Sequence, residues 1–198
     1  MFNIPNILTL FRIALVPLFV LAMVMSGDSA RITAFVIFCL AGVSDALDGF
    51  AARKLKAGSD FGKMLDPIAD KILVGVALMM LVADGVFDGY KLFPALVILA
   101  REILVSGLRE FLAGLDVSVP VSRIAKAKTA IQMIAIGAMI LRPLADGFVP
   151  GTPATFYSTF AYGALWLAAA LTVYTGYIYF RAGLAHVRPA RATHGEPV

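Results

Sequence analysis

Long runs of apolar residues alternate with short polar or charged stretches along the chain. A helix that crosses a bilayer needs about 20 mostly apolar residues, and six of the runs approach this length. They use most of the chain and leave little for a separate soluble domain. We therefore expect an all-α polytopic membrane protein, whose six transmembrane helices are predicted at residues 7–25, 31–52, 64–84, 91–112, 124–144 and 156–180.

The two ends of the chain are more polar than these runs. Asn6 and Thr9 interrupt the apolar start, which predicts a short interfacial segment before the first span. This start has no basic region followed by a small-residue cleavage site, so we do not expect a removable signal peptide. Residues 188–198 are polar and contain two prolines, a composition typical of disorder. We expect one membrane domain over residues 1–187 and a polar, disordered tail over residues 188–198.

The composition agrees with a membrane protein, since 60% of the residues are hydrophobic, 15% are charged and the mean hydropathy is +0.87. The 17 basic residues are unevenly placed: eleven lie on one side of the predicted spans, three on the other and three inside spans. An excess of Lys and Arg marks the cytoplasmic side, so both termini are expected there. The net charge of +4 thus indicates topology, and no nucleic-acid binding is expected. The eleven are Arg53, Lys54, Lys56, Lys63, Arg109, Arg123, Lys126, Lys128, Arg181, Arg188 and Arg191, against Arg31, Lys91 and Arg142.

Four aspartates gather where the second predicted helix ends and the third begins. Asp45 and Asp48 are three residues apart, and Asp66 and Asp70 are four apart, so each pair shares a helical face. The connection between the helices is short, which predicts that they are antiparallel and adjacent. The two pairs would then face each other just inside the cytoplasmic membrane surface. Because a carboxylate in a membrane segment is costly, such residues indicate function.

Four carboxylates this close together cannot all stay ionised without cations. Mg²⁺ and Mn²⁺ prefer oxygen ligands and often bind through carboxylates together with substrate phosphates. Two such ions about 4 Å apart would form a clamp for phosphoryl chemistry. Gly49, Gly62 and in part Ala52 leave space beside the backbone for a bulky group, and Arg53 could hold a phosphate oxygen. The alternative is a structural role, as helix caps, ion pairs and a membrane anchor.

Basic residues near the same membrane face predict a second phosphate contact. Arg101 lies inside the fourth span, where an unpaired guanidinium is costly. Arg109 lies two turns further along, and Lys126 and Lys128 begin the fifth span. We interpret these four as a pocket for a phosphomonoester at the cytoplasmic mouth. The alternative is that each arginine pairs with the glutamate that follows it and that the lysines only set topology.

The aspartate region resembles a known family. Read as D-x-x-D-G-x-x-A-R, eight further residues, then G-x-x-x-D-x-x-x-D, residues 45–70 match the motif of the CDP-alcohol phosphotransferase family at all eight fixed positions. The resemblance implies a six-helix membrane enzyme, usually a homodimer, with a site for two metal ions that opens to the cytoplasm. Such an enzyme transfers a phosphatidyl group from a CDP-linked lipid to an alcohol and releases CMP.

The resemblance also implies residue roles. Asp45, Asp48 and Asp66 would hold the two Mg²⁺ or Mn²⁺ ions, and Asp70 would act both as a ligand and as the general base. The residues that would contact the CDP portion are Thr9, Gly49, Ala52, Arg53, Ser59 and Gly62.

Further stretches point to one branch of the family. FNIPNILTLFRI, LDPIADKILV, AREILVSGLREF and AKAKTAIQM look like the bacterial branch that joins CDP-diacylglycerol to sn-glycerol 3-phosphate in phospholipid biosynthesis. This implies the bacterial cytoplasmic (inner) membrane, with the active site on the cytoplasmic side.

Two alternatives remain open. One keeps the reaction but uses inositol phosphate, serine or phosphatidylglycerol as acceptor. The other is a cation-coupled transporter. Two observations argue against it: the aspartates gather at one membrane face, and the sequence shows no two inverted halves.

Overall fold

The computed structural model describes residues 4–55, 60–87, 89–114, 123–145 and 154–187, and all regular structure within these ranges is helical. It comprises six α-helices and two short 3-10 helices, in agreement with the predicted all-α class. The α-helices are α1 (Ile4–Val24), α2 (Asp28–Leu55), α3 (Asp60–Ala83), α4 (Leu92–Ala113), α5 (Arg123–Leu141) and α7 (Ala154–Val187). The 3-10 helices are η1 (Gly89–Lys91) and η2 (Arg142–Leu144).

Within the described residues, three helices are long and apolar enough to cross a membrane by length and composition. Their apolar segments are Asn6–Val24 in α1, Ile124–Leu144 in α5 and η2, and Thr155–Leu184 in α7. The six α-helices lie at the positions of the six predicted spans, although α7 extends well beyond its predicted end. The chain is therefore a helical membrane protein whose helix number is compatible with six spans.

From Ile4 onwards, where the described residues begin, the predicted N-terminal interfacial segment is not a separate element. Helix α1 begins at Ile4 and continues without a break through Asn6 and Thr9. Both side chains are buried, with 3% and 1% of their surface exposed. Pro5 does not interrupt the helix, because a proline in the first turn removes an N–H group that has no helical partner in any case.

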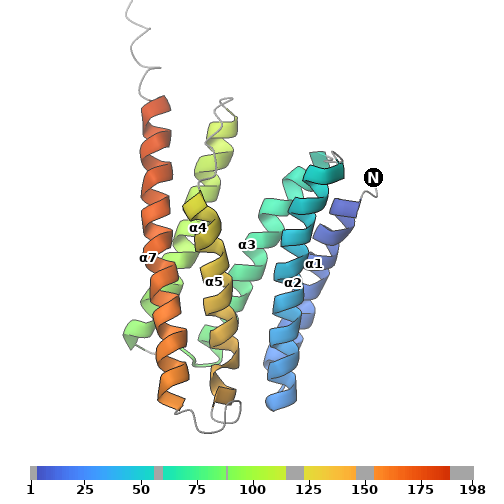
Figure 1. Ribbon diagram of the computed structural model, residues 1–198, viewed down its shortest axis with the longest axis vertical. Helices are drawn as coiled ribbons and strands as arrows, with labels where there is room; N and C mark the ends of the chain where they lie inside the picture. The colour runs from blue at the N-terminus through green and yellow to red at the C-terminus, as the bar shows by residue number, and fades with distance from the viewer. Residues whose placement is uncertain (1–3, 56–59, 88, 115–122, 146–153, 188–198) are drawn as a thin grey trace, which may run out of the picture.

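The helices form two groups along one long axis (Figure 1). Helix α1 packs extensively against α2 and also against α3, and α7 packs against both α4 and α5. Contacts of α2 with α5 and of α3 with α4 join the two groups. The predicted direct packing of α2 on α3 is limited to a small contact, and α1 instead packs against both. A short connection brings two helix ends together but does not require their full lengths to touch.

The core consists of apolar side chains from all six helices. Phe19 of α1 and Phe38 of α2 are almost fully buried, and their ring centres lie 6.1 Å apart. Outward-facing positions are also apolar, as Leu21 and Met79 illustrate with more than 60% exposure. Helices that are hydrophobic all round are typical of membrane spans.

Tight turns fix the helix ends on the side opposite the aspartates. Gly27, between α1 and α2, has a φ of +106°, which a residue with a side chain rarely adopts. Helix α3 ends in a similar way at Gly85, whose φ is +70°. There the Val86 N–H donates to the carbonyl of Leu81 at 3.1 Å, and the Gly85 N–H donates to that of Val82 at 3.0 Å. This pattern is a Schellman motif, which stops the helix at a defined residue.

Candidate active site

Asp45 is held by a buried arginine from a neighbouring helix. Nη1 of Arg12, on α1, lies 2.8 Å from Oδ1 of Asp45, on α2. The Arg12 side chain is fully buried, whereas that of Asp45 is 46% exposed. The pair fixes one carboxylate oxygen and leaves the rest of the group accessible. We gave Arg12 no role from sequence, although a lone arginine in an apolar run already indicates a buried partner.

Asp45 and Asp70 line one cavity of about 440 Å³. The cavity lies towards the end of the molecule where α2 ends and α3 begins, and α4, α5 and α7 complete its wall. Figure 1 shows how these helices are arranged. The structure thus brings carboxylates and basic residues together around one cavity. Its charged residues are Asp45, Asp70, Glu102 and Glu110 together with Lys71, Arg101, Arg109 and Lys128.

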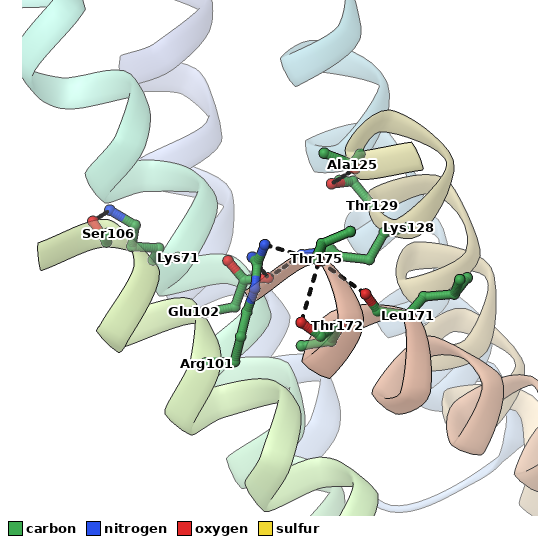
Figure 2. Close-up of polar contacts among 10 residues, drawn as sticks. All are labelled: Lys71, Arg101, Glu102, Ser106, Ala125, Lys128, Thr129, Leu171, Thr172 and Thr175. Atoms are coloured by element: carbon green, nitrogen blue, oxygen red, sulfur yellow. Dashed lines mark hydrogen bonds and ion pairs between the residues drawn. The ribbon is translucent and has the colours of Figure 1, made fainter. Parts of the chain in front are cut away.

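Glu102, on α4, contacts two of the cations (Figure 2). Lys128 of α5, which is buried, donates its Nζ hydrogen bond to Oε1 of Glu102. Nη1 of Arg101 lies 3.4 Å from the same oxygen. The local pair considered from sequence therefore exists for Arg101, but Glu102 is also shared with a second helix. Two cations that share one carboxylate keep a net positive charge for an anionic ligand.

Helix α7 holds the Arg101 side chain from the other side (Figure 2). Nη2 of Arg101 donates to Oγ1 of Thr175 at 3.1 Å, and the Thr175 hydroxyl donates in turn to the carbonyl of Leu171 at 2.8 Å. A Cβ atom on Gly176 would lie 3.2 Å from Cγ of Arg101, so glycine leaves space for the arginine stem. Nε of Arg101 is buried without a hydrogen-bond partner in the described part of the chain. Thr175 and Gly176 were not identified from sequence, because their role depends on α7 lying beside α4.

Arg109 and Lys126 differ in their placement. Arg109 is exposed and lines the cavity two turns beyond Arg101. Within the described residues it makes no ion pair with Glu110, so the local-pair alternative is not found there. Lys126 is exposed and does not line the cavity. Two residues correspond to about 200° around a helix, so Lys126 and Lys128 face different directions.

Lys71 joins two helices at the cavity rather than pairing with the adjacent Asp70. Its Nζ donates to Oγ of Ser106, which connects α3 to α4 (Figure 2). A carboxylate and an ammonium that are neighbours in the chain can point to different partners on a helix. Among the described ion pairs there is consequently none between Asp70 and the residue that follows it.

Several predicted site residues lie outside the described side chains. This applies to Asp48, Asp66, Gly49, Ala52, Arg53 and Ser59. Gly62 is described and buried in α3, and Thr9 is buried in α1 without lining the cavity.

The described residues can be compared with the ligands that a metal requires. Among the described side chains, no three or more His, Cys, Asp or Glu residues gather at one point, and two of the four predicted ligands lie outside this description. Asp45 and Asp70 line the same cavity and offer only carboxylate oxygens. Such donors suit a hard divalent cation, and the Arg12 contact orients one of them as outer-sphere partners of a metal do.

The arrangement combines two chemical capacities in one cavity. Carboxylates that line the cavity can hold cations or accept a proton, and the guanidinium and ammonium groups that line it beside them can bind a phosphate. The cavity therefore suits a reaction between two phosphorylated molecules at the membrane surface.

Comparisons with known proteins agree with this chemistry. The model of the family described as CDP-alcohol phosphatidyltransferase matches residues 2–176. A Rickettsia felis protein is 46% identical over 180 residues, covering 91% of this chain and 94% of its own. A Pectobacterium atrosepticum protein is 43% identical, with the same coverage of the two chains. An Escherichia coli K12 protein is 45% identical over 144 residues, covering 72% of this chain and 79% of its own. All three are named CDP-diacylglycerol–glycerol-3-phosphate 3-phosphatidyltransferase.

Proposed function

The chain belongs to the CDP-alcohol phosphatidyltransferase family, and we propose that it transfers the phosphatidyl group of CDP-diacylglycerol to sn-glycerol 3-phosphate. The products are phosphatidylglycerophosphate and CMP. The names of the similar proteins support this acceptor. The observation that carries the proposal is one cavity in which Asp45 and Asp70 share a wall with Arg101, Arg109 and Lys128.

Members of this family generally depend on a divalent metal ion. We assign two Mg²⁺ or Mn²⁺ ions to Asp45, Asp48, Asp66 and Asp70. The carboxylate oxygens of Asp45 and Asp70 at the cavity wall support this assignment, because Mg²⁺ and Mn²⁺ prefer oxygen ligands. When bound, the ions neutralise charge on the pyrophosphate of the lipid substrate.

The residues of the chain then have separate tasks. The phosphomonoester of the acceptor is bound by Arg101, Arg109 and Lys128. Lys126 does not line the cavity and assists them only through its positive charge. Asp70 takes the proton from the primary hydroxyl of sn-glycerol 3-phosphate, whose oxygen attacks the phosphorus that bears the diacylglycerol. The bond from this phosphorus to the CMP oxygen breaks. Positioning and electrostatics carry most of such a transfer.

The CDP portion is assigned to residues near the start of α1, the end of α2 and the start of α3. We keep the set implied by the family motif, which is Thr9, Gly49, Ala52, Arg53, Ser59 and Gly62. Glycines at two of these positions let a bulky nucleotide approach the backbone.

We also propose the arrangement in the membrane. All six α-helices span the bilayer of the bacterial inner membrane, with both termini and the active site on the cytoplasmic side. The enzyme is a homodimer, with a membrane domain over residues 1–187 and a disordered tail over residues 188–198. The distribution of basic residues supports the orientation.

The function is tested by CMP release from purified protein in detergent. CDP-diacylglycerol and Mg²⁺ or Mn²⁺ are supplied with sn-glycerol 3-phosphate, inositol phosphate, serine or phosphatidylglycerol, one at a time. Of the four acceptors, we expect only sn-glycerol 3-phosphate to support CMP release. In Asp70→Asn the rate of this release should fall about 10²–10⁴-fold. Asp84→Asn is the matched control, since Asp84 follows the opposite end of α3.

Each contrary result has a defined meaning. Release with a different acceptor keeps the site but replaces sn-glycerol 3-phosphate. Near-normal turnover of Asp70→Asn excludes the assigned base. No release with any acceptor, from folded and metal-loaded protein, favours the transporter alternative.

A further inference from the structure

A second cavity lies at the end of the molecule opposite the candidate active site. Its volume is about 520 Å³, and it lies where α2 and α7 begin and α3 and α5 end. Figure 1 shows these four helix ends at the same end of the molecule. Arg31, Asp84, Arg142 and Ser158 supply its polar side chains. The proposed reaction uses none of them.

The charge of Arg31 is already balanced. Its Nη2 donates to Oδ2 of Asp84, directly after α3. Its Nη1 lies 3.4 Å from the sulfur of Met23. These contacts hold the Arg31 guanidinium at the cavity wall, and the ion pair with Asp84 leaves little net charge on this side.

Arg142 forms no ion pair within the described residues. Its guanidinium carbon lies 5.2 Å from the centre of the Tyr162 ring, and Nζ of Lys91 lies 5.1 Å from the same centre. No described residue accepts a hydrogen bond from Nε of Arg142, which is buried. An aromatic face attracts a cation but carries no countercharge. Counting two arginines and one aspartate, the described lining side chains have a net charge of +1.

The position of the cavity limits what can balance this charge. The apolar segment Ile124–Leu144 ends two residues after Arg142, and the segment Thr155–Leu184 begins three residues before Ser158. The cavity therefore lies where apolar spans meet the polar layer of a bilayer. The phosphate groups of phospholipids are abundant at this level, and a phosphodiester carries one negative charge.

We propose that this cavity binds the phosphate group of an anionic phospholipid. Arg142 is the cationic partner of the phosphate, and the Ser158 hydroxyl donates a hydrogen bond to it. Val86, Pro143 and Ala145 also line the cavity and provide apolar contacts beside the polar ones. This site does not depend on the proposed reaction, since its residues lie at the other end of the helices.

Native mass spectrometry of the purified protein tests the proposal. The probes are dioleoylphosphatidylglycerol, dioleoylglycerol, which has the same chains without phosphate, and inorganic phosphate. We expect the wild type to retain one phosphatidylglycerol, and Arg142→Gln to bind it about tenfold more weakly, because one charge-assisted contact is lost. Equal retention of dioleoylglycerol, or displacement of the lipid by inorganic phosphate, would overturn a lipid phosphate as the ligand.

Matched variants separate this site from its surroundings. Lys91→Gln removes the other cation that lies over the Tyr162 ring, and Lys91 does not line the cavity. Arg109→Gln removes a cation of the candidate active site. Both should retain the lipid as the wild type does. Loss in Arg109→Gln with full retention in Arg142→Gln would assign the lipid to the other cavity and overturn the proposal.

A second variant keeps the test valid if Arg142→Gln does not fold. Ser158→Leu fills the cavity and changes no charge, and it should also weaken retention of phosphatidylglycerol about tenfold. CMP release by Arg142→Gln and Ser158→Leu should remain close to that of the wild type, which serves as the measure of folding. Wild-type lipid retention in Ser158→Leu would contradict the proposed site.

Discussion

At the scale of single residues, the basic side chains of the candidate active site differ in how firmly they are held. Lys128 is buried and paired with Glu102, whereas Arg109 is exposed and has no ion pair within the described chain. Arg101 is intermediate, with contacts to Glu102 and to the Thr175 hydroxyl. The direction of its guanidinium therefore depends on a neutral residue from α7.

Replacing Thr175 by valine tests this positioning role. Thr175→Val keeps the shape but removes the acceptor at 3.1 Å from Nη2 of Arg101. Because a hydrogen bond to a charged group contributes about 1.5–3 kcal/mol, we expect the KM for sn-glycerol 3-phosphate to rise roughly tenfold or more. The kcat should change little, since Thr175 touches no reacting atom. Steady-state CMP release at varied acceptor concentration measures both constants.

Thr172 provides the control for this substitution. It lies one turn earlier on α7, is fully buried, and its Oγ1 has no hydrogen-bond partner among the described residues. Thr172→Val should leave the KM unchanged and keep or slightly raise stability. An equal rise in KM for both variants would mean that valine disturbs α7 generally, and that Thr175 does not position Arg101.

At the scale of helices, the sequence was sufficient to place the elements but not to choose all their neighbours. Apolar length and charged ends predicted six helices close to those observed. The short connection between α2 and α3 restricts only the adjoining ends of these helices, so it could not show that α1 packs against both. Glu102 illustrates the same limit, because its pairing with Lys128 depends on α5 lying within side-chain reach of α4.

Two glycines of α7 test how the packing of this helix affects the site. A Cβ atom at Gly176 would lie 3.2 Å from Cγ of Arg101, whereas one at Gly163 would meet nothing within 4 Å. Gly163→Ala should stabilise the protein by roughly 0.5–1 kcal/mol, as expected for alanine in a helix interior. Gly176→Ala should gain less stability and raise the KM for the acceptor. Thermal unfolding in detergent and CMP release measure the two effects, and a higher KM in Gly163→Ala alone would contradict this expectation.

At the scale of the whole molecule, the two ends of the helices carry different charged cavities. Counting spans from the sequence predicted that Asp45, Asp70, Arg101 and Arg109 lie at the same end, and the structure brings them to one cavity. The second cavity was not predicted, because Arg31 and Arg142 are about 110 residues apart in the sequence. They line one cavity only because α2 and α5 pack side by side.

Labelling of single cysteines tests the proposed orientation of these two ends. Cys39, the only cysteine, is first replaced by serine. Ser26→Cys, in the turn before α2, should then react with a membrane-impermeant maleimide added outside spheroplasts. Ala113→Cys, at the end of α4, should react only after the membrane is opened. Labelling of both positions from the same side would contradict six spans in the proposed orientation.

The contact between Arg12 and Asp45 has a consequence for how the chain enters the membrane. On its own, α1 would bring an uncompensated guanidinium into hydrocarbon, at a cost of about 2.5–3.5 kcal/mol on insertion scales. Its partner follows on α2, which α1 packs against extensively and to which a turn of three residues connects it. The first two helices are thus expected to leave the insertion machinery as one hairpin, with the carboxylate and the guanidinium already neutralising each other. A residue of the candidate active site would thereby also take part in membrane insertion.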